Sequence, residues 1–258
     1  MLSTQAELVA FRTGLGQPLQ FVPTMGGLHV GHGELIRRAA EQGPVLVSVF
    51  VNPLQFGPGE DFDRYPRSLE ADLALADRCG AAALWAPTVQ TIYPDGAAAD
   101  SACQAPAALQ QYLCGAGRPG HFDGVVTVVA RLLELTKPAG LWLGEKDWQQ
   151  LVILRQLVAD RALPVKIHGV ATVREADGLA LSSRNQYLSA AQRLQAAALP
   201  AALRAADGTT PLDVTRSRLS AAGLEVEYVE RVDPQSLQPC GSETALSLLA
   251  AAVRCGTT

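Results

Sequence analysis

Short apolar runs alternate with helix-like segments through the first two-thirds of the chain, and this alternation constrains the fold more than any other feature. Leu19–Val22 and Val45–Val51 are bounded by Pro and Gly, as is typical of buried strands in a parallel sheet. Gly33–Gln42, which lies between them, has helical composition. Together the three segments predict a strand–helix–strand unit with a right-handed crossover.

The same alternation continues as far as residue 173. Further helices are predicted at Leu69–Cys79, Val125–Leu135 and Gln149–Asp160, and further strands at Ala82–Trp85, Gly140–Leu143 and Pro164–Val173. Repeated units of this kind predict a Rossmann-like α/β domain with a doubly wound parallel sheet, over residues 1–173.

The texture changes after Arg174. An Ala-rich helical stretch is followed by a predicted strand at Leu224–Val232 and a predicted helix at Glu243–Val253. We therefore expect a smaller α+β domain over residues 174–258, with the role of a lid over the first domain.

Composition argues against several classes of function. The formal charge of −4 gives no general attraction to nucleic acid or to anionic membranes. No stretch approaches the roughly 20 apolar residues of a membrane span, and the N-terminus does not resemble a signal peptide, so a cytoplasmic location is expected. Free thiols are expected for the scattered cysteines, which are Cys79, Cys103, Cys114, Cys240 and Cys255.

The segment Pro23–His32 (PTMGGLHVGH) leaves the first predicted strand through a glycine turn and enters the first helix at about Gly31. In an open α/β sheet this is the carboxyl edge, where ligands bind. Gly26 and Gly27 allow a ligand close to the main chain, and unpaired amides at the start of a helix favour phosphate.

His29 and His32 are three residues apart, so both imidazoles can face one phosphate chain and stabilise charge on the α-phosphate. Two other interpretations stay open at this point. The pair can simply cap and fill the first turn of the helix, or it can belong to a zinc site, for which no third ligand is near in sequence.

Two downstream segments carry groups suited to phosphate. Lys146 lies between a predicted strand and a helix, at the same edge of the sheet, although a lone lysine there is more often a solvated charge. Ser182-Ser183-Arg184 offers two hydroxyls and a guanidinium on a loop, or else a pair of helix-capping serines beside an exposed arginine.

The His29-Val-Gly-His32 sequence resembles the His-x-Gly-His signature of nucleotidyltransferases, and its setting resembles the pantothenate synthetase (pantoate–β-alanine ligase) family. Further blocks resemble that family in order and spacing across nearly the whole chain. They are Phe50–Phe56, Glu60–Arg67, Arg118–Phe122, Gly144–Gln150 and Val173–Asn185.

The resemblance implies an AMP-forming ligase that condenses (R)-pantoate with β-alanine through a pantoyl-adenylate, with ATP as substrate and Mg²⁺ arriving with the nucleotide. It implies a homodimer and assigns no protein ligand to the metal. Catalytic roles fall on His29, His32, Lys146 and Arg184. Pantoate and β-alanine fall to Gln55 and Gln150, neutral amides that both donate and accept hydrogen bonds. The resemblance assigns ATP binding to Met25, Gly26, Gly27, Leu28, His29, Val30, Gly31, His32, Gly144, Glu145, Lys146, Asp147, Val173, Leu181, Ser182, Ser183 and Arg184.

The C-terminal segment Ala252–Thr258 resembles cyanobacterial members in which the ligase is fused to a cytidylate kinase, and a shortened second domain is expected there. Two other functions remain as alternatives. One is an adenylyltransferase that stops at a dinucleotide, and the other is a nucleotide-binding regulatory module without turnover.

Overall fold

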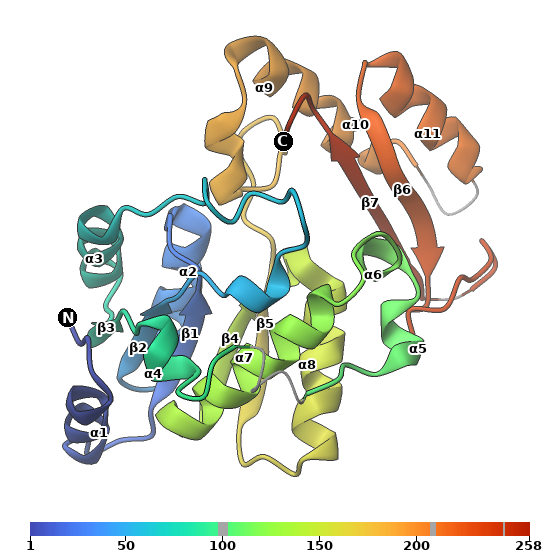
Figure 1. Ribbon diagram of the computed structural model, residues 1–258. Helices are drawn as coiled ribbons and strands as arrows, with labels where there is room; N and C mark the ends of the chain where they lie inside the picture. The colour runs from blue at the N-terminus through green and yellow to red at the C-terminus, as the bar shows by residue number, and fades with distance from the viewer. Residues whose placement is uncertain (98–102, 207–209, 245) are drawn as a thin grey trace. The chain divides into compact units, whose positions relative to one another are not determined.

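The computed structural model describes residues 1–97, 103–206, 210–244 and 246–258, which form two compact units (Figure 1). The first unit contains Met1–Pro106 and Pro119–Thr172, and the second contains Ala107–Arg118 and Val173–Thr258. The segment Ala107–Arg118 joins the second unit although it interrupts the first in sequence, which the alternation of strands and helices does not reveal.

A five-stranded parallel sheet forms the centre of the first unit. Its strand order is β3-β2-β1-β4-β5. The strands are β1 (Gln20–Thr24), β2 (Val45–Val49), β3 (Ala83–Trp85), β4 (Gly140–Gly144) and β5 (Lys166–Val170). The predicted doubly wound sheet is confirmed, and each predicted strand overlaps an observed one.

Helices cover both faces of this sheet (Figure 1). On one face α2 (Val30–Ala40) and α3 (Leu69–Arg78) bury Ile36 and Ala76 against Val22 and Val47 of the sheet. On the other face lie α7 (His121–Thr136) and α8 (Trp148–Asp160), which pack against each other. The remaining helices of the unit are α1 (Gln5–Thr13) and α4 (Val89–Ile92).

Pro23 ends the hydrogen-bonded pairing of β1 with β4. The N–H of Gln20 points to β2, where it donates to Pro44 O, whereas Leu19 O accepts from Ala139 N–H on the side of β4. Because successive residues of a strand address opposite neighbours, the nitrogen of Pro23 faces β4. Proline has no N–H to donate, and the β1–β4 pairing ends before it, at Phe21 with Leu141. The hydrogen-bonded pairing of the two strands therefore stops before their carboxyl ends.

The second unit packs helices on a two-stranded antiparallel sheet, β6 (Glu225–Val232) with β7 (Leu248–Arg254). Its core contains Leu219, Leu224 and Val229. Its helices are α5 (Ala107–Gln110), α6 (Leu113–Gly117), α9 (Ala190–Ala196), α10 (Ala198–Arg204) and α11 (Leu212–Ala221).

The predicted helix at Glu243–Val253 is wrong. Leu248–Arg254 is strand β7, which pairs with β6 from Leu248–Val232 to Arg254–Glu225, and residue 245 lies outside the described residues. Its Leu and Ala residues are good helix formers, but pairing with β6 outweighs a preference worth only tenths of a kcal/mol per residue, roughly. Propensity alone does not detect a partner strand so close in sequence.

Candidate functional site

The strand order fixes where the sheet of the first unit reverses its direction of growth. Chain connections leave β1 and β4 in opposite directions along the sheet, so the carboxyl ends of these two neighbours form its switch point, where ligands bind in open α/β sheets. The turn Met25–His29 follows β1, and Gly144–Asp147 follows β4. The predicted nucleotide residues of the first unit therefore follow the two strands that meet at this switch point.

Gly26 shapes the turn after β1. Its φ is +94°, a conformation that residues with side chains rarely adopt. A Cβ at this position would lie 3.0 Å from Val49 Cγ1 and 3.1 Å from Asp72 Oδ2. Only glycine therefore fits without displacing the strand or the carboxylate beside it.

Asp72 holds the turn from α3. Its Oδ2 accepts from Gly27 N–H at 3.1 Å and its Oδ1 accepts from Leu28 N–H at 2.6 Å. The side chain is buried, and this burial raises the pKa of Asp72, while the two backbone hydrogen bonds oppose the rise. The carboxylate thus fixes the main chain just before the histidines.

Five amides of the turn and the helix start donate to acceptors within the protein. Gly26 N–H donates to Thr24 Oγ1, and those of Gly27 and Leu28 donate to Asp72. The N–H groups of His29 and Gly31 donate to imidazole nitrogens. These five amide donors therefore have acceptors inside the protein, and the side chains of the segment offer further donors to a phosphate.

His29 and His32 form a reciprocal cap at the start of α2. Gly31 N–H donates to His29 Nδ1 at 3.1 Å, and His29 N–H donates to His32 Nδ1 at 3.2 Å. A neutral imidazole has one donor and one acceptor nitrogen, so Nδ1 as acceptor leaves the proton on Nε2 of both rings. The ring centroids are 4.1 Å apart. The capping role is therefore real, and it leaves each ring one N–H donor for a ligand.

Both rings are held neutral. Burial, followed by the charge of Lys146, lowers the pKa of His29 to about 4, while the charge of Asp147 opposes the shift. Burial, followed by the charge of His29, lowers the pKa of His32 to about 3. At neutral pH the pair therefore offers uncharged donors, and the positive charge of this edge comes from Lys146.

Lys146 lies on the single turn Glu145–Asp147 that follows β4. Its Nζ lies 3.2 Å from Asp147 Oδ1, in an exposed pair. Such surface pairs contribute about 1 kcal/mol or less, so an incoming phosphate can compete with Asp147 for the ammonium. Lys146 is thus available at the edge where the sequence placed it.

Gln55 belongs to a polar network beside the turn. Its Nε2 donates to Met25 Sδ at 3.1 Å, and its Oε1 accepts from Asn52 Nδ2 at 3.1 Å. Asn52 is buried; its Nδ2 also donates to Gly124 O at 3.0 Å, and its Oδ1 accepts from Tyr93 Oη at 2.8 Å. The network fixes the amide of Gln55 next to Met25.

Other predicted residues lie where their segments imply. Gln150 is in the first turn of α8, half-buried, and Val30 begins α2 with an exposed side chain. The sequence alone assigned no role to Tyr93, Asn52 or Asp72. An aspartate in the first turn of a helix is normally interpreted as a dipole partner, so only the fold reveals its hold on the turn.

The second unit carries the other predicted nucleotide residues. Leu181 N–H donates to Val173 O at 3.0 Å, which pairs these two positions across a short hairpin. Ser182 caps the single turn η3 (Ser183–Tyr187), with its Oγ accepting from Arg184 N–H at 3.3 Å. The serine-capping interpretation is therefore correct for Ser182, and it places Ser183 and Arg184 at the beginning of η3.

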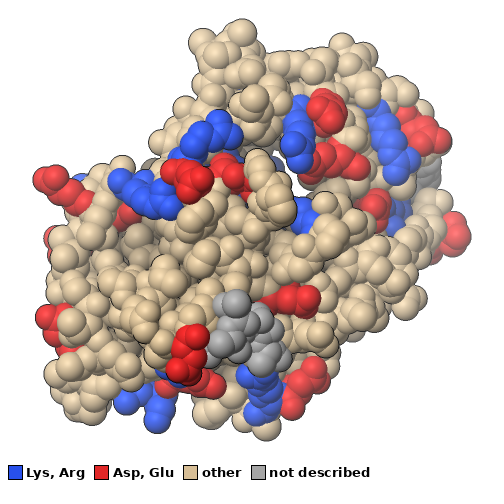
Figure 2. Space-filling model, in the orientation of Figure 1, with Lys and Arg blue, Asp and Glu red and all other residues tan. Residues whose placement is uncertain are grey.

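Charged side chains of both signs are interspersed on the face shown in Figure 2, in keeping with the small net charge. Among the described residues no three His, Cys, Asp or Glu side chains are grouped so as to hold a metal ion. None of the described helices is both long and apolar enough to span a membrane. All five cysteines are free thiols.

Fold and site together define a doubly wound α/β protein whose switch point presents a glycine turn, two neutral imidazoles and a lysine. The sequence model of the pantoate–β-alanine ligase family matches residues 1–258. The chain belongs to this family.

Curated relatives agree with the assignment. The chain is 94% identical over 258 residues to a bifunctional pantoate ligase/cytidylate kinase of Parasynechococcus marenigrum, covering 100% of this chain and 52% of the relative. It is 74% identical to the protein of the same name from a Synechococcus strain, covering 92% of this chain and 49% of that protein. The chain thus spans about half the length of these relatives.

Solved structures agree as well. Pantothenate synthetase from Thermus thermophilus superposes with a TM-score of 0.90 at 44% identity, covering 98% of this chain and 95% of that one. The ligase from Francisella tularensis, which was crystallised with β-γ ATP and β-alanine, gives a TM-score of 0.83 at 35% identity, with 90% of each chain covered.

Proposed function

We propose that the chain is an ATP-dependent, AMP-forming ligase that condenses (R)-pantoate with β-alanine through a pantoyl-adenylate. The observation that carries the proposal is the pair of neutral imidazoles at the switch point, with Nδ1 used by the backbone and Nε2–H left for a ligand. Membership of the pantoate–β-alanine ligase family supplies the substrates.

The first step forms the adenylate. A pantoate carboxylate oxygen attacks the α-phosphorus of ATP, the bond from that phosphorus to the bridging oxygen of the β-phosphate breaks, and pyrophosphate leaves. Negative charge grows on the non-bridging α-phosphate oxygens in the transition state, where the Nε2–H donors of His29 and His32 stabilise it. Lys146 supplies the positive charge that these neutral rings do not.

The second step forms the amide. The amine of β-alanine attacks the acyl carbon of pantoyl-adenylate, AMP leaves with the acyl–oxygen electron pair, and a proton is lost from nitrogen. No covalent protein nucleophile takes part, so the protein's task is placement and charge stabilisation. Gln55 and Gln150, with donor and acceptor atoms but no charge, suit the hydroxyls and carboxylate of pantoate and β-alanine.

The remaining nucleotide contacts are assigned to the two segments beyond the histidine turn. Gly144–Asp147 in the first unit and Val173 with Leu181–Arg184 in the second contribute them, with Ser182, Ser183 and Arg184 directed to the triphosphate. Mg²⁺ prefers oxygen ligands and retains several waters, so phosphate oxygens provide most of its coordination and it enters with the nucleotide. When bound, it shares the triphosphate charge.

Pantoate-dependent exchange of pyrophosphate into ATP tests the first step directly. We expect exchange with pantoate and none with nicotinate mononucleotide or pantetheine phosphate, the substrates of the adenylyltransferase alternative. A nucleotide-binding regulatory module would give no exchange with any of them. Absence of pantoate-dependent exchange would reject the proposal.

Lys146→Ala should abolish adenylate formation while preserving the fold, because an exposed lysine contributes within about 0.5 kcal/mol to stability. Lys166→Ala, which removes an exposed lysine from β5, is the matched control and should exchange normally. Near-normal exchange by the Lys146 variant would contradict its phosphate role.

The homodimer, the lid role of the second unit and the cytoplasmic location stay predictions.

A further inference from the structure

A tight hairpin directly precedes the Ser182–Arg184 segment. Its strands pair through Arg174 and Ala180, and the turn between them is closed by Gly178 N–H donating to Glu175 O at 2.8 Å. Gly178 has a φ of +93°, as expected after a type I turn in a three-residue hairpin loop. The position of this turn therefore determines where the chain emerges as Ser182.

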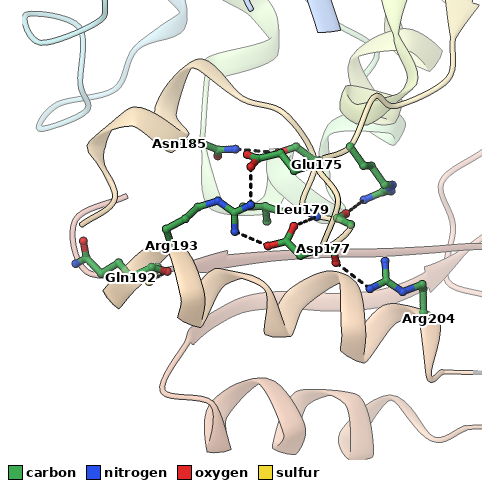
Figure 3. Close-up of polar contacts among 11 residues, drawn as sticks. Glu175, Asp177, Leu179, Asn185, Gln192, Arg193 and Arg204 are labelled. Atoms are coloured by element: carbon green, nitrogen blue, oxygen red, sulfur yellow. Dashed lines mark hydrogen bonds and ion pairs between the residues drawn. The ribbon is translucent and has the colours of Figure 1, made fainter. Parts of the chain in front are cut away.

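Arg193, on α9, forms ion pairs with two carboxylates of this turn through the two terminal nitrogens of its guanidinium (Figure 3). Its Nη2 lies 2.7 Å from Glu175 Oε2 and its Nη1 lies 2.6 Å from Asp177 Oδ2. Asp177 Oδ1 at the same time accepts from Leu179 N–H at 3.0 Å. The arginine between the two carboxylates offsets their mutual repulsion and joins the turn to α9.

Further hydrogen bonds hold the two segments that Arg193 joins, α9 and the hairpin. On the helix side, Ser189 and Gln192 form a reciprocal capping box that fixes the first turn of α9 just before Arg193. On the loop side, Asn185 Nδ2 donates to Ala180 O at 3.0 Å, which ties η3 back to the hairpin. The chain from the turn, through the serine–arginine segment, to α9 is thus a closed loop.

The two ion pairs of Arg193, with Glu175 and with Asp177, form a clamp on the turn, and its Asp177 half persists to low pH. The hydrogen bond from Arg193, with those from the backbone, lowers the pKa of Asp177 to about 2. The side chains of Arg193, Glu175 and Asp177 are 25%, 37% and 38% exposed, so the clamp lies near the surface of the second unit and is not part of its core. Its loss should consequently change the position of the loop more than the stability of the unit.

We propose that Arg193 is a positioning residue for adenylate formation: it clamps the Glu175–Gly178 turn and so holds Ser182, Ser183 and Arg184 in place for the triphosphate. This inference rests on the proposed function. It assigns Arg193 no contact with substrate, and it confines its effect to the step in which pyrophosphate is still attached.

Two half-reactions measured on the same variants test the role. Arg193→Gln should lower the kcat/KM for ATP in pantoate-dependent exchange by roughly tenfold, because the loop must then be ordered at each turnover. Aminolysis of supplied pantoyl-adenylate by β-alanine, which involves no triphosphate, should stay within about twofold of the wild type. Arg193→Lys keeps the charge but cannot fork to both carboxylates, so its exchange should lie between these values.

Glu175→Gln tests the clamp from its other side and should lower exchange in the same direction. Arg254→Gln is the matched control, since Arg254 pairs with Glu227 across the β6–β7 sheet, and both half-reactions should be unchanged.

Three results would overturn the inference: normal exchange by Arg193→Gln, an equal loss in both half-reactions, or an equal loss in the Arg254 control. If Arg193→Gln does not fold, the Arg193→Lys and Glu175→Gln variants decide in the same way. Failure of the wild type to exchange with pantoate would instead reject the proposed function.

Discussion

The two nitrogens of His32 have separate tasks, and two substitutions can separate them. Nδ1 accepts from His29 N–H at 3.2 Å and so belongs to the cap of α2, whereas Nε2–H is left for the phosphate. The amide oxygen of asparagine reaches the place of Nδ1, whereas alanine reaches the place of neither nitrogen. His32→Asn therefore keeps the cap and loses the donor, and His32→Ala loses both.

The expected magnitudes differ accordingly. Loss of one donor to charge that develops in a transition state lowers a rate by about 10²–10³-fold, or about 2.7–4 kcal/mol, which we expect for His32→Asn. Its free energy of unfolding should change by less than about 0.5 kcal/mol, because His29 N–H keeps an acceptor. His32→Ala should lose as much in exchange and, in addition, about 0.5–2 kcal/mol in stability, because that N–H loses its acceptor.

Pantoate-dependent pyrophosphate exchange measures the first quantity, and urea unfolding followed by circular dichroism measures the second. The expected result is a similar loss of exchange in both variants, with a loss of stability in the alanine variant alone. Near-wild-type exchange by His32→Asn would refute the assignment of Nε2 as the phosphate donor, and a loss of stability in His32→Asn as large as that in His32→Ala would refute the assignment of Nδ1 as the cap.

Three further predictions follow from the same region. The free energy of unfolding should decrease as pH falls from about 6.5 towards 4, because the unfolded chain binds protons that the folded chain does not. Folding lowers the pKa values of His29 and His32 to about 4 and about 3. His32→Asn should flatten this pH dependence in urea titrations, and an unchanged slope would contradict the prediction. Gly26→Ala should cost about 1–3 kcal/mol in thermal unfolding, whereas Gly16→Ala, with open space around it, should be nearly neutral. Asn52→Asp should cost roughly 3 kcal/mol and raise the KM for pantoate, because a carboxylate oxygen would then face acceptor oxygens; an unchanged KM would separate Asn52 from substrate binding.

Much of the first unit could be predicted from its sequence because each strand is a local signal. Runs such as Val45–Val49 are apolar, β-branched and bounded by Pro or Gly, so composition and length suffice to locate them. The edge at which Lys146 lies follows from the order of strand and loop alone. The strand order, and with it the pairing of the β1 and β4 turns, depends on contacts between segments more than 100 residues apart, for example Phe21 with Leu141.

The site was predictable in its side chains and not in its hydrogen bonds. The spacing of His29 and His32 indicates a shared face, but which nitrogen each ring offers depends on backbone donors that only the folded turn brings together. Likewise, the amides of Gly27 and Leu28 are not free, because Asp72, more than 40 residues away, accepts from both. In the second unit, β7 was mistaken for a helix because its strand character comes from its partner.

Pro23 gives the early end of the β1–β4 pairing an origin in the main chain. This loss of pairing requires no side chain that touches a ligand, only an imino acid at a position whose nitrogen faces the neighbouring strand. Grafting the histidine pair onto another parallel sheet would therefore transfer the imidazole donors without the unpaired strand ends that stand beside them here. An engineer who wished to move this arrangement to a new scaffold would need to carry the proline with it.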